Sequence, residues 1–535
     1  MTPELGRPRR TWRALVAALA LTLALPASAL GAHGYNTASA PYISLLGAYA
    51  PAGATPGTVI PLINSGETFD SVRFQGIPDG LGAVPGDGWV DIYVAHEEST
   101  VPFMGFADLQ ASSVTRVRVD TAEKSILEME VALGAGAGFV RFCSAFMAGP
   151  EHGFPSYTFF VNEEADETIH TVPAGAVYGA DPFLAPNRQA GYSVWLDTAT
   201  GEFDVISRAG RHNHENTVVI PGGWKNLAIL SGDDTFNAPS SQLYLYTAND
   251  AEQVMDDKGQ LWAFQVTATD EGPLADPYDP FNNANDLLDI TNNESAPWSG
   301  RFIHVPTDIA RGVTNEAPQA ALENWSNANN VFQFVRVEDL AYDPDNPLVV
   351  YFADTGTSRL AESETTGRLI RLGSGGTLSN GRIFKMVLNA KDPRIVDEFS
   401  VFADSLPVPP GGIAADGVAF VNPDNLDVGH SSLMVQEDSS SNNDIWQYSL
   451  VADTWVKVAS VTGTGASAES SGIISLEDIP GFEAGWWAID VQGHQNIASF
   501  TVAGFTWVGP PSSATGPYSK RLEEGQLLLM FIPGS

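Results

Sequence analysis

The chain has 535 residues, with 64 acidic and 27 basic side chains and a formal net charge of −37. This excess of negative charge makes nucleic acid and anionic membranes poor partners, and it suits solubility and cation binding. Cys143 is the single cysteine in the sequence, so an internal disulfide is excluded.

The first 29 residues have the features of an export signal. Arginines at positions 7, 9, 10 and 13 precede the uncharged apolar run 14–25, and Ala27-Ser28-Ala29 offers small residues for cleavage. A membrane anchor is the weaker interpretation, because the apolar run is shorter than the ~20 residues that span a bilayer. The pair Arg9-Arg10 also allows twin-arginine export. We therefore expect an exported protein, periplasmic or extracellular, without stable membrane insertion.

Short β-type runs dominate the rest of the chain. Examples are the runs 90–94, 157–161 and 348–352, and most such runs are bounded by Gly, Pro, Asp or Asn. Radially repeated four-stranded sheets house many strands without exposing long edges. We predict an all-β fold, a six-bladed β-propeller with short helical insertions, in a single domain over residues 30–535. The sequence repeat is weak, so the number of blades does not come from periodicity.

Two segments interrupt the strand pattern. Residues 276–298 are rich in Asp and Asn, and they form either a helix-bearing insertion or a separate calcium loop. The segment lacks the spacing and the glycine of an EF-hand, which favours a polar excursion over a dedicated site. Residues 315–330 predict a short helix.

Acidic side chains gather where the strand-like runs end. The groups are His96-Glu97, Glu163-Glu164, His214-Glu215, Asp233-Asp234, Arg336 with Glu338 and Asp339, Asp424, Glu437-Asp438 and Glu469. Hard cations such as Ca²⁺ require several oxygen ligands, which separate strand ends can deliver to one centre. For any one group, an ordinary solvated loop acid is the simpler interpretation. The strand-end position shared by the whole set favours a metal site.

The order of these motifs resembles the PhoX-type alkaline phosphatases and their phytase-like relatives. The matching segments are Gly-Arg-x-x-His-Glu at 210–215, Gly-Asp-Asp at 232–234, Arg-x-Glu-Asp at 336–339, Pro-Asp-Asn-Leu at 423–426, Glu-Asp at 437–438 and Glu-x-x-Gly at 469–472. The resemblance covers residues 70–500. It implies an exported six-bladed propeller that holds calcium and iron at its centre and hydrolyses phosphate monoesters.

Carried over to this chain, the resemblance assigns roles to individual side chains. It makes Glu215 and Glu338 metal-ligand carboxylates and Arg336 the guanidinium that clamps the phosphoryl group. Glu163 and Glu164 match an acidic pair that the phosphatases precede with a cysteine ligand of iron.

Asn162 stands where that family cysteine is expected. An amide oxygen prefers harder ions than a thiolate does, so calcium is the expected ion and Fe³⁺ is disfavoured. Cys143 matches a further cysteine-containing segment of the family, and we interpret it as a buried structural thiol rather than a replacement ligand. His214 is interpreted as a brace for Glu215.

The chemistry also follows without the resemblance. Divalent ions and a bidentate arginine stabilise the negative charge that develops on a phosphoryl group during in-line displacement. The carboxylates expected to hold the ions are Glu163, Glu164, Glu215, Glu338 and Glu469, with Asp424 and Asp438 as ligands or orienting groups.

Two functions remain open at this point. The first is a metal-dependent phosphoesterase, a monomer acting on a small phosphate ester, which the retention of Arg336 and Glu338 favours. The second is a non-catalytic, calcium-stabilised propeller that binds a partner or an extracellular polymer, which Asn162 favours. No Ser-His-Asp order, Gly-x-Ser-x-Gly elbow or phosphate-binding glycine loop stands out in the sequence.

Overall fold

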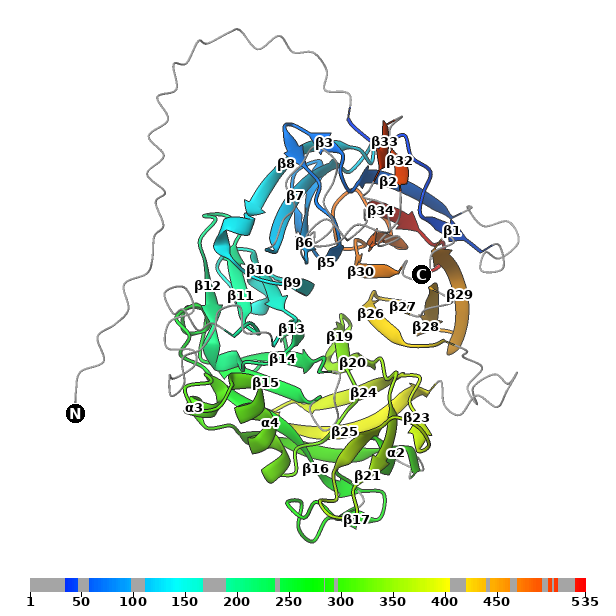
Figure 1. Cartoon of the computed structure of the whole chain (residues 1–535). Helices are drawn as coiled ribbons and strands as arrows, with labels where there is room; N and C mark the ends of the chain where they lie inside the picture. Colours follow the sequence, from blue (N-terminus) through cyan, green and yellow to red (C-terminus); the bar gives the residue numbers. More distant parts are fainter. Residues whose placement is uncertain are drawn as a thin grey trace, which may run out of the picture.

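The computed structural model describes residues 34–46, 57–97, 111–166, 189–235, 241–282, 284–292, 297–404, 420–438, 443–461, 469–492, 499–502, 505–508 and 525–535. The expected export signal, residues 1–29, lies outside this part of the chain. Antiparallel sheets make up most of the described structure, and they are arranged radially around a common centre (Figure 1).

Four sheets have their strands in a simple order from the centre outward. They are β5 (Pro78–Pro85), β6 (Trp89–His96), β7 (Ser113–Asp120) and β8 (Ile126–Leu133); β9 (Phe142–Ala148), β10 (Thr158–Glu163), β11 (Ser193–Asp197) and β12 (Phe203–Ile206); β26 (Pro423–Val428), β27 (Ser432–Glu437), β28 (Asp444–Ser449), β29 (Thr454–Val461) and β1 (Ile43–Leu45); and β30 (Ser470–Ser475), β31 (Trp486–Val491), β34 (Gln526–Phe531) and β2 (Thr58–Asn64).

A fifth sheet is longer and has two edges at the centre. Its strands are, in order, β13 (His214–Ile220), β14 (Leu227–Asp233), β15 (Leu243–Ala248), β16 (Gln260–Thr269), β18 (Trp298–His304), β25 (Asp392–Asp404), β24 (Arg382–Asn389), β20 (Asn346–Asp354) and β19 (Val337–Asp343), with β17 (Gly272–Pro273) paired to β16. Small sheets join β21 (Arg359–Glu362) to β22 (Leu369–Leu372) and β23 (Thr377–Leu378), β3 (Thr68–Phe69) to β4 (Val72–Arg73), and β32 (Ser499–Val502) to β33 (Phe505–Val508).

The inner strands close into a ring. Among the described residues, β5 contacts β9, and the contacts continue through β13, β19, β26 and β30 back to β5. Because the long sheet supplies two of these strands, β13 and β19, the sheets do not divide into six separate blades. The predicted number of blades therefore stays a prediction.

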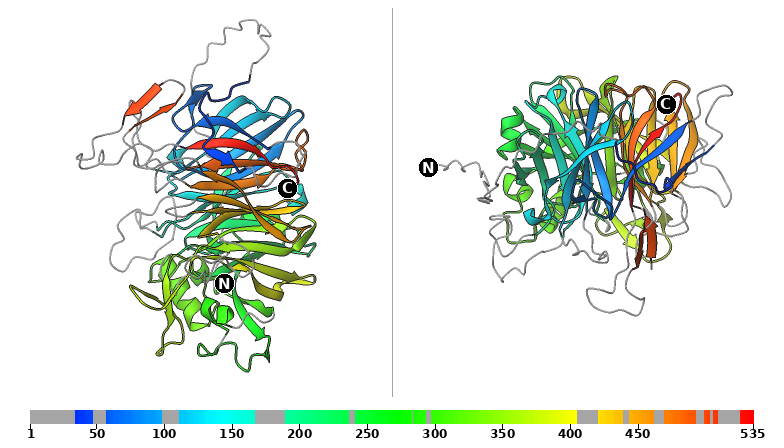
Figure 2. Two further views of the ribbon diagram at one scale, coloured as in Figure 1. Left: turned by 90° about the vertical axis from the view of Figure 1, so that its right-hand side faces the viewer. Right: turned by 90° about the horizontal axis from the view of Figure 1, so that it is seen from above.

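Strands from both ends of the described chain complete the ring. β2 pairs with β34, and β1 pairs with the outer strand β29. Figure 2 shows the blue β2 and the red β34 side by side in both views. The two sheets that contain β26 and β30 are thus finished by residues from the other end of the chain.

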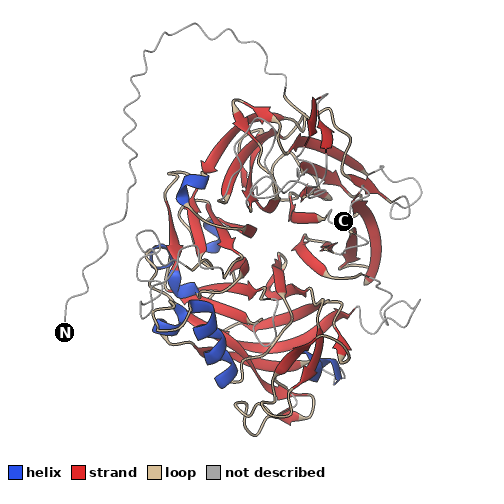
Figure 3. Ribbon diagram, in the orientation of Figure 1, coloured by secondary structure: helices blue, strands red, loops and turns tan. Residues whose placement is uncertain are grey.

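Helices lie at the outer rim, away from the centre (Figure 3). They are α1 (Ala251–Met255), α2 (Leu287–Asn292), α3 (Thr307–Ala310) and α4 (Pro318–Ala328). α4 falls within the predicted helix 315–330, and α2 shows that the segment 276–298 carries a helix. No helix in the described ranges is long and apolar enough to cross a membrane.

An aromatic cluster holds the two halves of the long sheet together. The Phe334 side chain is fully buried just before β19. Its ring centroid lies 4.7 Å from that of Phe332, 5.3 Å from Phe384, 5.5 Å from Phe352 and 6.0 Å from Phe399. The Phe334 ring packs on β20, β24 and β25, and the Phe332 ring beside it lies 5.9 Å from that of Phe264 in β16, so the two rings together couple the segment that leads to Glu338 to both halves of the sheet.

We expect Phe334→Ala to lower the free energy of unfolding by about 3–5 kcal/mol, because the lost ring leaves a cavity in a packed core. The control is Phe281→Ala, since Phe281 is 59% exposed, and its effect should stay within about 0.5 kcal/mol. Denaturant unfolding measures both. Equal effects of the two substitutions would contradict this assignment of the core.

Candidate metal centre

Each inner strand begins with the same irregularity. In all six pairs formed by an inner strand and its neighbour, the register shifts between the first and fourth residues of the inner strand. A bulge of this kind re-aims the side chain of the extra residue. The second residues of the inner strands are Asp79, Cys143, Glu215, Glu338, Asp424 and Ser471.

A second layer comes from the residues that directly follow the neighbouring strands. These residues are Glu97, Glu164, Asp234, Thr355, Asp438 and Gln492. Each donates its backbone N–H to the carbonyl of a residue just before the inner strand, for example Glu164 to Arg141 at 2.9 Å and Asp438 to Asn422 at 2.9 Å. The same backbone bond thus fixes two potential ligands in every unit of the ring.

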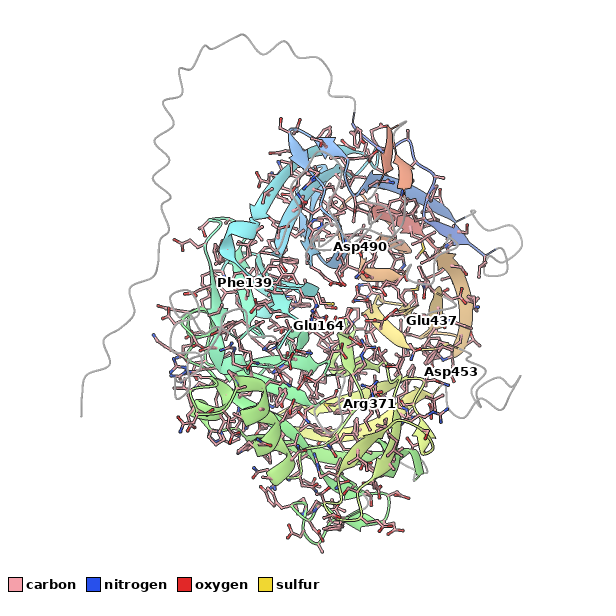
Figure 4. All side chains as sticks on the ribbon, in the orientation of Figure 1. Phe139, Glu164, Arg371, Glu437, Asp453 and Asp490 are labelled. Carbon is pink, nitrogen blue, oxygen red and sulfur yellow. The ribbon has the colours of Figure 1, made fainter. Side chains whose placement is uncertain are left out.

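Candidate ligand atoms converge in three overlapping groups. Within each group one atom per residue lies within 4.8 Å of the others; the groups are Glu215 with Glu338 and Asp424, Cys143 with Glu164 and Glu215, and Asp79 with Glu97 and Cys143. Figure 4 shows Glu164 close to the common centre. Of the residues singled out in the sequence, the structure therefore brings Glu164, Glu215, Glu338 and Asp424 together.

Asp438 and Glu469 adjoin the same cluster beside Asp424. Burial and the neighbouring Asp438 carboxylate raise the pKa of Glu469 well above its usual value. Burial and then Asp438 likewise raise the pKa of Asp424. Glu97, which belongs to the group of Asp79 and Cys143, also raises the pKa of Glu469, so the acids surround the centre.

Glu163 faces away from the centre. Its Oε1 accepts the N–H of Val140 at 2.9 Å, and its Oε2 accepts the N–H of Tyr192 at 3.2 Å. Successive residues of a strand point to opposite faces, so the pair Glu163-Glu164 is split between two environments. Glu437 plays the same part before β26, where it accepts the N–H of Val421 at 2.8 Å.

Asn162 is also committed to the protein framework. Its Nδ2 donates to the Glu215 carbonyl at 2.9 Å, and its Oδ1 accepts from the Thr217 hydroxyl at 3.0 Å. The Cys143 sulfur instead lies among the acids, and its thiol donates to Asp79 Oδ2 at 3.4 Å. The interpretation of Cys143 as a structural thiol therefore does not fit the geometry.

Arg336 is held over the cluster by two carboxylates. Its Nε and Nη2 donate to Asp234 at 2.8 and 3.0 Å, and Nη2 also lies 2.8 Å from Glu338 Oε1. The backbone of Arg336 has a φ of 66°, a left-handed conformation that is strained for a residue with a side chain. The bidentate pair with Asp234 fixes the plane of the guanidinium.

A layer of hydrogen bonds supports the ligands from behind. The Ser144 hydroxyl donates to Glu215 Oε1 at 2.6 Å and accepts from Asn425 Nδ2 at 3.1 Å. Asp339 accepts from Asn216 and, at 3.1 Å, from the N–H of Leu426. These side chains are the third residues of their inner strands, so the bulges position both the ligands and their supports.

The electrostatics of the cluster require a positive charge. Burial, then neighbouring acids, raises the pKa of Asp79, Glu164, Glu215 and Glu338 well above the usual range. Asp79 Oδ1 and Glu215 Oε2 are buried without a hydrogen-bond partner among the described residues. Buried carboxylates at this density are stable only when protons or cations neutralise them. The oxygen donors fit hard cations, and the sulfur adds a softer ligand.

Sequence reasoning assigned no individual ligand role to four residues of this centre, Asp79, Glu97, Cys143 and Asp234, although Glu97 and Asp234 belong to the acidic groups from which it predicted a metal site. The signal that could have found them is positional. Asp79 and Cys143 are the second residues of inner strands, whereas Glu97 and Asp234 follow the neighbouring strands. The same positions in other units carry Glu215 and Glu164.

A protein-family model described as alkaline phosphatase PhoX matches residues 161–476. The chain belongs to the PhoX alkaline phosphatase family. The structure of Pseudomonas fluorescens PhoX in complex with vanadate, a transition state analogue, matches with a TM-score of 0.58 and 14% identity, covering 93% of this chain and 97% of that one. At that identity the match supports the fold alone. The family and the all-β propeller class predicted from the sequence are confirmed.

The remaining comparisons add little to the PhoX assignment. The periplasmic gluconolactonase PpgL of Pseudomonas aeruginosa matches with a TM-score of 0.31 and 11% identity, over 74% of this chain and 88% of that one. Similarity at that level carries no weight. Comparison with curated proteins found no match.

The neighbours Glu163 and Glu164 provide a matched pair of substitutions. We expect Glu163→Gln to lower the free energy of unfolding by about 1–3 kcal/mol. Both carboxylate oxygens of Glu163 accept a backbone N–H, and the amide of the glutamine would place its own N–H against one of these donors. Metal content should not change. Glu164→Gln should lower the metal content and leave the metal-free stability unchanged or higher. Elemental analysis and unfolding of both variants test this, and loss of metal in Glu163→Gln alone would contradict it.

Proposed function

We propose that this chain is an exported, metal-dependent phosphoesterase that hydrolyses small phosphate monoesters as a monomer. The observation that carries the proposal is the convergence of carboxylates from separate inner strands beside a fixed guanidinium, Arg336, in a chain of the PhoX family. Export rests on the sequence of residues 1–29. The single-domain organisation over residues 30–535 is part of the same proposal.

Two sets of residues are suited to hold cations. Glu215, Glu338 and Asp424 form an all-oxygen set, which suits calcium. Cys143 with Glu164 and Glu215 adds a thiolate, which suits a softer ion such as iron. Asp438 and Glu469 beside Asp424 extend the oxygen set. Bound cations supply positive charge for the phosphoryl oxygens and activate water for attack.

The role of Arg336 is to orient the phosphoryl group. The Arg336 side chain is 11% exposed, and its guanidinium is held by Asp234 and Glu338, so it is placed before substrate arrives. A preorganised donor of this kind spends no energy on reorganisation during the reaction. Burial of the surrounding carboxylates strengthens every charge interaction at the centre.

The alternative, a non-catalytic calcium-stabilised propeller, is less well supported once the positions of Asn162 and Cys143 are considered. That alternative depended on Asn162 at the expected position of the family cysteine. In the structure Asn162 bonds to β13, and the Cys143 sulfur lies in the acid cluster instead. The reason to disfavour iron is removed with it.

Arg336→Ala should lower kcat/KM for an aryl phosphate by about 10²-fold or more, since a removed transition-state donor typically costs that much. Chelation should abolish hydrolysis, and added calcium, alone or with iron, should restore it. The control is Arg371→Ala, in β22 of a small outer sheet. Wild-type hydrolysis by Arg336→Ala, or no hydrolysis at any metal loading, would sink the proposal.

Cys143→Ser separates the two kinds of ion. A hydroxyl is a poor substitute for a thiolate at a soft metal, so iron content should fall to background while calcium content changes little. Asn162→Ser should keep its iron, since both polar atoms of the Asn162 side chain are engaged by hydrogen bonds to β13. Elemental analysis of purified protein measures both. Iron lost from the Asn162 variant but kept by the Cys143 variant would reverse the assignment.

A further inference from the structure

A second group of carboxylates lies far from the ring of inner strands. Asp286 directly precedes α2, Asp289 lies in its first turn, and Glu362 ends β21. One oxygen from each lies within 4.8 Å of the others. Figure 1 shows α2 and β21 at the lower end of the molecule, away from the centre that carries Glu215. The segment 276–298, expected from sequence to be a polar excursion, therefore places two of its carboxylates beside Glu362.

Asp286 has an oxygen that the protein leaves without a donor. The side chain is fully buried, and Oδ1 accepts the N–H groups of Leu288 at 2.8 Å and Asp289 at 3.1 Å. Oδ2 is buried with no hydrogen-bond partner among the described residues. A buried carboxylate oxygen in that state is costly unless a cation or a proton meets it. Asp289 and Glu362 each bring an oxygen within 4.8 Å of an Asp286 oxygen, so the neighbours of this carboxylate are further acceptors and not donors.

The local charge is not balanced by the protein. Arg368 is the basic side chain beside the group, and it is 4% exposed. Its guanidinium donates to Asn330 Oδ1 at 2.9 Å, to the Val331 carbonyl at 2.6 Å and to Asn327 Oδ1 at 3.2 Å, and to none of the three carboxylates. Burial raises the pKa of Asp286 to about 7 and that of Asp289 to about 8. Three acids thus lie near one basic side chain, Arg368, whose hydrogen bonds are made to Asn327, Asn330 and Val331.

The backbone holds the three acids in place without an ion. The N–H of Leu287 donates to the Gln333 carbonyl at 2.9 Å, and Asn285 Nδ2 donates to the Gly367 carbonyl at 2.9 Å. The second bond ties the segment before α2 to the turn that follows β21, and the first ties α2 to the segment that precedes β19. The ligands are therefore preorganised on two segments that are distant in sequence.

We propose that Asp286, Asp289 and Glu362 bind a calcium ion that fastens α2 to β21. All three ligands are hard oxygens, and the exposed Glu362 leaves one side open for water molecules, an irregular shell that calcium accepts and magnesium does not. The site takes no part in the reaction proposed for the central cluster. Its role is to secure the insertion 276–292 against the outer sheet.

Calcium binding to the whole chain tests the site, with calcium alone as the probe. Equilibrium dialysis should show one ion per chain fewer in Asp286→Asn than in the wild type. Glu362→Gln should weaken one class of ion at least tenfold. Glu364→Gln is the matched control, because it changes an exposed acid on the same hairpin outside the group. Its calcium binding should equal that of the wild type.

Limited proteolysis adds a local measurement. In the wild type, cleavage within residues 276–298 should be slower in calcium than in chelator, and this difference should vanish in Glu362→Gln. Hydrolysis of an aryl phosphate at saturating metal should be equal in Glu362→Gln and the wild type, which separates this site from the central one. If Asp286→Asn does not fold, Glu362→Gln decides alone. Unchanged calcium stoichiometry and affinity in Glu362→Gln would overturn the proposal.

Discussion

The structure depends on one electrostatic constraint, which is that many carboxylates are buried close together at the centre of the ring. Glu215, Glu338, Asp424 and their neighbours are removed from water, and each raises the pKa of the next. Such a cluster is stable only with compensating positive charge, and Arg336 supplies a small part of it. Holding these acids together in the ring of sheets costs free energy, which bound cations would offset. The cluster therefore requires cations for its stability, independently of any reaction.

The bulge at the start of each inner strand converts a simple sheet into this site. It moves one side chain per strand toward the axis, while the next residue turns to support its neighbours. Cys143 and Glu215 reach the cluster in this way, and Ser144, itself held by Asn425, braces Glu215. Ser471, at the sixth position, shows that one unit already does without an acid there.

Sequence alone predicted the all-β class and the gathering of acids, because strand ends that carry acids are visible in the pattern. It could not separate Glu163 from Glu164, since that depends on which face of β10 points inward. Nor could it choose between Asn162 and Cys143, because a register within each strand decides which one reaches the centre. The long sheet shared by β13 and β19 was also hidden, since pairing between β18 and β25 joins residues nearly a hundred positions apart.

The pairing of β2 with β34 sets the order in which the molecule can be assembled. The sheet that Glu469 precedes contains both strands, so this side of the cluster has its full support only after β34 has been synthesised. Until then, the acids from earlier parts of the sequence repel one another in a ring that is not yet closed. Pairing of β34 with β2 and β31 thus completes the enclosure in which these acids need compensating charge.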